Sequence, residues 1–146
     1  MSADYELLLV DNLVKGFDLY QYPRTSPSDS FNIPREDAFI QEAVFLENAN
    51  SIACGSDHGK IYLFSLETTK CTQKLSHGAR KSTIQILDVC CPSSILCLPT
   101  LPHGSFQACT SNNRHMIASS SNNSKPCIYI WEKKVCPNEY FSDNLG

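Results

Sequence analysis

Ile61-Tyr62-Leu63-Phe64-Ser65 is the stretch that decides the predicted fold, because its layout occurs three times in the chain. The layout returns at Ile128-Tyr129-Ile130-Trp131-Glu132 and, more loosely, at Phe17-Asp18-Leu19-Tyr20-Gln21. Each copy alternates two apolar residues with a more variable one, then adds an aromatic residue and a polar residue. Tyr20 and Phe64 lie 44 residues apart, within the period of about 40–45 residues expected for repeated four-stranded units. The repetition predicts similar sheets that offer a surface for holding other molecules.

The clearest unit of this repeat covers residues 38–78. Short apolar or alternating runs are separated there by clusters of turn-forming residues; the runs are 43–46, 51–55, 60–66 and 71–75. Four short strands at regular spacing, each bounded by turn chemistry, are typical of an antiparallel meander. The predicted fold class is therefore all-β.

The rest of the chain divides around this unit. Residues 1–37 predict a hairpin followed by a proline-containing connection, in which Phe31–Ile33 can add a short strand. Residues 79–136 repeat the plan of 38–78, with strands expected at 83–89, 115–120 and 128–132 and a loop insertion at 90–113. We expect the fourth strand of this second unit to be absent or vestigial, and a polar tail at 137–146.

Composition limits the possible functions. The chain has 146 residues, a net charge of −3 and only scattered Lys and Arg, so no basic patch favours nucleic acid. No basic, apolar leader and no apolar stretch of about 20 residues occurs, and we therefore expect a cytoplasmic or nuclear protein without a membrane partner. The eight cysteines are interpreted as mainly buried free thiols that pack as small apolar residues.

Residues Gly55–Ser65 closely resemble the segment of a WD40 repeat that joins its second and third strands. Asp57 lies near the family's turn aspartate, Phe64 stands at the tryptophan position, and Ile130-Trp131-Glu132 comes nearer still to the Trp-Asp signature. His77-Gly78 inverts the family's Gly-His pair. The resemblance implies a β-propeller blade and a protein-binding scaffold without catalytic activity or cofactor.

The length of the chain predicts an incomplete WD40-like β-propeller, with about two four-stranded antiparallel blades and a flanking hairpin. A closed ring needs roughly 4–8 blades, and an open row leaves unpaired faces at both ends. Three explanations stay open. The chain is a truncated fragment without independent function, it associates with itself or with another partial propeller, or it is a small independent β-domain.

The expected contacts with a protein partner are exposed residues of the loops: Asp57, His58, Lys60 and Asn123. Loops on rigid sheets are the usual carriers of binding residues. No nucleophile elbow and no phosphate-cradling glycine loop occurs, so we expect no catalytic or cofactor-binding residues.

A zinc site is the alternative from another functional class. Five potential ligands follow one another at intervals of six residues: Cys91, Cys97, His103, Cys109 and His115. Cysteine and histidine are zinc ligands, but zinc sites usually pair them two to four residues apart. The sequence thus favours chance placement and leaves a small zinc-stabilised domain using the 90–115 loop as the alternative.

Overall fold

The computed structural model describes residues 1–2, 5–46, 49–77, 83–90, 115–121, 128–133 and 141–143. For 85–90 and 141–143 it describes the backbone alone. Within these ranges the protein is all-β, with three antiparallel sheets and no helix. The predicted fold class is confirmed at this level. No helix of the described residues is long and apolar enough to cross a membrane.

The first sheet has three strands in the order β1-β2-β3. Their bounds are β1 (Leu7–Asp11), β2 (Gly16–Gln21) and β3 (Asp29–Asn32). The predicted hairpin is confirmed, with Leu8 opposite Tyr20 and Val10 opposite Asp18. The start of β2 requires glycine, because Gly16 has a φ of 135° and an added Cβ would lie 2.1 Å from the Phe31 carbonyl oxygen.

The middle sheet is the meander that the sequence predicts for 38–78. Its strands are β4 (Ala43–Leu46), β5 (Ser51–Cys54), β6 (Lys60–Ser65) and β7 (Cys71–Ser76), in the order β4-β5-β6-β7. Both faces are buried, which explains why β5 and β6 are apolar almost throughout. Cys54 is a buried free thiol as expected, whereas Cys71 is an exposed one.

The third sheet corrects one expectation. Its strands are β8 (Ile84–Cys90), β9 (His115–Ser121), β10 (Ile128–Lys133) and β11 (Phe141–Asp143), in the order β11-β10-β9-β8. Of the two expectations for a fourth strand, absent or vestigial, the second is met: β11 has three residues and pairs with β10, inside the segment expected to be only a polar tail. Three residues are too few for a period-two pattern, so the pairing partner defines this strand. Most of the predicted 90–113 insertion lies outside the described residues.

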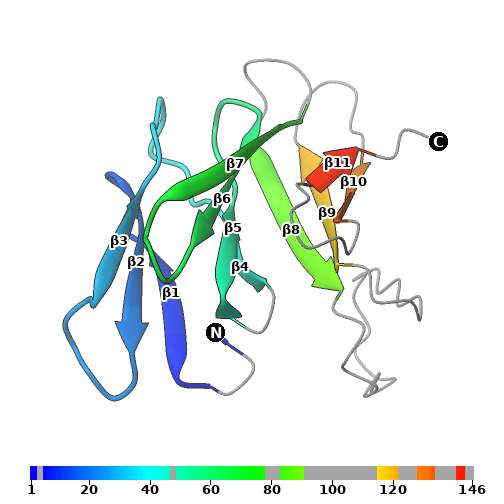
Figure 1. The fold of residues 1–146 in the computed structure, drawn as a ribbon. Helices are drawn as coiled ribbons and strands as arrows, with labels where there is room; N and C mark the ends of the chain where they lie inside the picture. The colour runs from blue at the N-terminus through cyan, green and yellow to red at the C-terminus, as the bar shows by residue number, and fades with distance from the viewer. Residues whose placement is uncertain are drawn as a thin grey trace, which may run out of the picture.

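The three sheets pack face to face in a row, with the middle sheet between the other two (Figure 1). Side chains alternate along β6: Tyr62 and Phe64 point to the first sheet, and Ile61 and Leu63 point to the third. This alternation follows from the period of two in any strand. The apolar core thus consists of two layers, one on each side of the middle sheet.

Strand pairing confirms that the three sequence copies occupy equivalent places. They form β2, β6 and β10, and each pairs with the strand before it in the same register. The aromatic residue of each copy faces an aliphatic one: Leu8 with Tyr20, Ile52 with Phe64, and Ile117 with Trp131. The middle copy therefore presents one alternating set of side chains to the sheet before it and the other set to the sheet after it, and the first and third copies each present one set to the middle sheet.

A buried polar cluster connects the middle and third sheets. The Ser119 hydroxyl lies 2.7 Å from Nδ1 of His77 and accepts a hydrogen bond of 3.1 Å from Nε1 of Trp131. The His77 ring also packs on Tyr129, with 4.4 Å between ring centroids. The sequence drew attention to His77 only because His77-Gly78 inverts the Gly-His pair of WD40 repeats. The contact of His77 with Ser119, 42 positions away, was not predicted.

Candidate functional site

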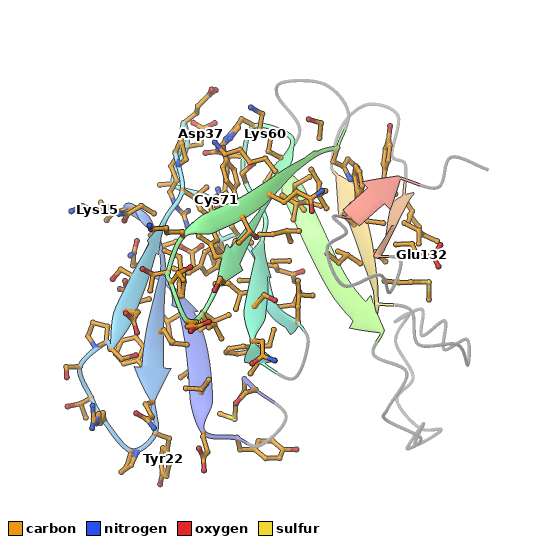
Figure 2. All side chains as sticks on the ribbon, in the orientation of Figure 1. Lys15, Tyr22, Asp37, Lys60, Cys71 and Glu132 are labelled. Atoms are coloured by element: carbon orange, nitrogen blue, oxygen red, sulfur yellow. The ribbon has the colours of Figure 1, made fainter. Side chains whose placement is uncertain are left out.

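The predicted contact residues gather at one end of the middle sheet, in the turn between β5 and β6. Asp57 and His58 form this turn and Lys60 begins β6. Figure 2 places Lys60 beside Asp37, at the upper end of the view, with Lys15 on the same side and Tyr22 at the opposite end. Asn123, the fourth predicted contact, lies outside the described residues.

Asp57 is buried, so its expected role as an exposed contact is corrected. Its Oδ2 accepts hydrogen bonds from the backbone N–H groups of Glu36 and Asp37, at 2.7 and 2.8 Å, and its Oδ1 lies 2.9 Å from Nδ1 of His58. Burial by itself would raise the pKa of Asp57, but the hydrogen bonds from Asp37, His58 and Glu36 outweigh it and lower the pKa. The carboxylate therefore serves to hold the β3–β4 connection against the β5–β6 turn.

His58 is also largely covered, with its side chain 13% exposed. Its ring bridges two groups, because Nδ1 contacts Asp57 and Nε2 lies 2.7 Å from the Tyr62 hydroxyl. Burial, and then electrostatic interactions with Cys71 and Asp57, raise the pKa of Tyr62, which keeps its phenol protonated. The Asp57–His58–Tyr62 chain thus fixes the turn. Lys60, like His58, is half-buried, so neither is the fully exposed contact that the sequence predicts.

The β3–β4 connection, residues 33–42, is anchored at both ends. Near its start, the buried Arg35 guanidinium forms an ion pair with Asp11 and donates a 2.9 Å hydrogen bond to the Phe39 carbonyl. Near its end, the Gln41 N–H donates to the other oxygen of Asp11 at 2.7 Å, and the Glu42 carbonyl accepts from the Gly55 N–H at 2.8 Å. These contacts hold the connection in one shape, although it forms no strand.

Four large apolar side chains are exposed at this end of the molecule, and we call them, together with Lys60, the loop-end surface. They are Leu13 and Val14 in the β1–β2 turn and Phe39 and Ile40 in the β3–β4 connection. Phe39 is 60% exposed and Ile40 is 79% exposed. The two loops belong together, because Asp11 accepts hydrogen bonds from Leu13 N–H and from Gln41 N–H.

Sequence reasoning missed this apolar set. It included 38–42 in the 38–78 unit but assigned these residues no strand and no role. The sequence does contain a weak signal, because Phe39-Ile40 is an apolar pair between acidic residues at 36, 37 and 42 and no alternating pattern includes it. Only the anchored backbone reveals that both side chains point away from the core.

The predicted zinc ligands are not brought together in the described residues. Cys91, Cys97, His103 and Cys109 lie outside these residues, and of His115 only the backbone in β9 is described. Within the described ranges, no group of three or more His, Cys, Asp or Glu side chains is arranged to hold a metal ion.

Asp57→Asn is expected to lower stability at neutral pH and to change its pH dependence. The lowered pKa means that the carboxylate stabilises the fold above the unfolded pKa of about 3.9 and that this contribution is lost as pH falls through the folded pKa. Hydrogen bonds to charged groups contribute roughly 1.5–3 kcal/mol, so we expect a loss of about that size at pH 7.

Urea unfolding of the wild type and Asp57→Asn from pH 7 down to pH 3 tests this expectation. The difference in unfolding free energy should shrink toward acid, and exposed Asp37→Asn should give a small difference at every pH. A constant difference between wild type and Asp57→Asn across the range would contradict the role given to this carboxylate.

Comparison with known proteins identifies no relative. No protein-family model matches the chain, and neither a curated protein nor a solved structure matches it significantly.

Proposed function

We propose that the chain is a protein-binding scaffold of the WD40-repeat type, in which the three sheets are successive blades of an incomplete propeller. The support is the repeated register of β2, β6 and β10 and the antiparallel order of four strands in the middle and third sheets. The resemblance of Gly55–Ser65 to the family's turn segment supports the same interpretation. The proposed partners are other proteins of the cytoplasm or nucleus, and no catalytic step is assigned.

The observation that carries the binding function is the anchored loop that exposes Phe39 and Ile40. Large apolar side chains at the centre of an interface supply most of the binding free energy in many complexes. A loop already held by Arg35 and Gln41 loses little conformational freedom when a partner binds. Lys60 and the acidic residues beside the loop would form a polar rim around the apolar contacts.

The test compares the proteins retained by three immobilised chains: the wild type, Phe39→Ser/Ile40→Ser, and Tyr22→Ser. Tyr22 is as exposed as Ile40 but lies at the opposite end of the molecule (Figure 2), which makes it a matched control. Quantitative mass spectrometry should find partners that the double variant retains at least about tenfold less, because hot-spot contacts contribute 2 kcal/mol or more. Tyr22→Ser should retain these partners unchanged.

A purified partner identified in this way should then bind the wild type more tightly than the double variant in a direct affinity measurement. Unfolding curves of both variants should match the wild type, because the substituted side chains are exposed. The proposal fails if both variants retain the same proteins in the same amounts, or if the wild-type chain shows no cooperative unfolding and is therefore a fragment without an independent fold.

A further inference from the structure

In the part of the chain that the structure describes, the two sheets at the ends of the row each expose two large apolar side chains on their outer face, although Glu132, in the same alternating set as Ile128 and Ile130, is buried. On the third sheet, Ile128 is 66% exposed and Ile130 is 49% exposed. On the first sheet, Leu8 is 39% exposed and Val10 is 38% exposed. We call these the third outer face and the first outer face. They lie on opposite ends of the row, since the inner face of each sheet packs on the middle sheet.

The middle sheet has a face equivalent to the third outer face, and there the next sheet covers it. Ile128 and Ile130 hold the positions in β10 that Ile61 and Leu63 hold in β6, because Tyr129 and Trp131 face back toward the preceding sheet as Tyr62 and Phe64 do. Ile61 and Leu63 are 0% and 3% exposed, since the next sheet lies on them. Ile128 and Ile130 therefore belong to the same kind of surface, and no sheet among the described residues lies on them.

The first outer face is the complementary surface. Leu8 and Val10 hold the positions in β1 that Ile52 and Cys54 hold in β5, each opposite the same place of the following strand. Ile52 and Cys54 are fully buried because the preceding sheet lies on them. This face also carries Asp18, whose carboxylate accepts hydrogen bonds from Asn12 and Ser30 at 3.1 and 2.7 Å.

We propose that two copies of this chain associate head to tail, with the third outer face of each copy on the first outer face of the other. The chain already packs this pair of surfaces twice, at the two internal interfaces between its sheets. Two such contacts between two copies close a ring of six sheets, which lies within the range of roughly 4–8 blades that propellers use. Head-to-tail contacts either close in this way or continue into filaments. The proposal rests on sheet packing and does not depend on the loop-end surface.

Sedimentation velocity of the wild-type chain at about 100 µM, where even a micromolar interface is filled, should give twice the mass of 16.3 kDa. Ile130→Glu and Val10→Glu, one on each face, should each give monomers, because a buried unpaired carboxylate is strongly unfavourable. Val14→Glu is the control, because it makes the same kind of change in the β1–β2 turn, where Val14 is more exposed than Ile130 or Val10. This variant should remain dimeric.

Mixing the variants distinguishes a head-to-tail contact from a symmetric one. An equimolar mixture of Ile130→Glu and Val10→Glu retains one undamaged first outer face and one undamaged third outer face that can meet, so differently tagged chains should pair. A monomeric wild type, a dimer that survives either single variant, or a mass above two copies would each overturn the proposal. Phe39→Ser/Ile40→Ser should stay dimeric, so that loss of partner binding and loss of self-association are separate results.

Discussion

Phe64→Ala is expected to remove about 3–5 kcal/mol of the unfolding free energy, the usual cost of truncating a buried phenylalanine. Phe64 is buried between the first and middle sheets, with its ring 5.3 Å from that of Phe31 and 6.4 Å from that of Tyr62. The truncation would leave a cavity lined from both sheets. Domains are typically stable by only 5–15 kcal/mol, so the variant should unfold at a much lower urea concentration.

The chain contains a matched control for this substitution. Phe39→Ala makes the same chemical change on an exposed side chain, and substitutions of that kind usually alter stability by less than about 0.5 kcal/mol. Equilibrium urea unfolding of both variants beside the wild type measures the two effects. Equal losses at positions 39 and 64 would contradict the packing of the middle sheet described above.

Asp11→Ala is the second substitution with a large expected effect. The carboxylate of Asp11 pairs with Arg35 and accepts hydrogen bonds from the N–H groups of Leu13 and Gln41. Both members of the ion pair are buried, with side chains 5% and 9% exposed. Removing one member leaves a buried charge without a counterion, which costs about 3–5 kcal/mol. The same change frees both loops of the loop-end surface, so partner binding should weaken as well.

A double variant separates the buried charge from the other losses. In Asp11→Ala/Arg35→Met the guanidinium is absent, so stability should recover in part relative to Asp11→Ala alone. Asp29→Ala, an exposed aspartate at the start of β3, serves as the control and should be close to wild type. If the double variant loses the sum of the two single losses, Asp11 and Arg35 do not act as a pair.

The middle sheet could be predicted from sequence because its information is local. Alternating residues and turn clusters define β4 to β7 without reference to the rest of the chain, and the three copies mark equivalent strands. Strand β11 could not be predicted, because three residues carry no pattern and only β10 makes them a strand. For so short a segment, the strand beside it in space determines whether it becomes part of a sheet.

The candidate site was predicted only in part, for a related reason. The β5–β6 turn was recognised from Ser56-Asp57-His58-Gly59, but the residue types of a turn do not reveal what packs on it. The backbone N–H groups of Glu36 and Asp37, 21 and 20 positions upstream, donate hydrogen bonds to the Asp57 carboxylate. Phe39 and Ile40 are exposed on the same connection, which Arg35 and Gln41 anchor through contacts that are also distant in sequence.

The hydroxyl of Ser119 has a consequence for the order in which the protein assembles. It accepts from Trp131 within the third sheet and contacts His77, which follows β7, so the His77 contact forms only after the middle and third sheets have docked. Before docking, the His77 ring has to stay hydrated, because a polar group without a partner is costly in an apolar layer. The two sheets therefore dock and exclude water from this boundary at the same time, so a pair of sheets, and not a single sheet, is the unit that gains stability.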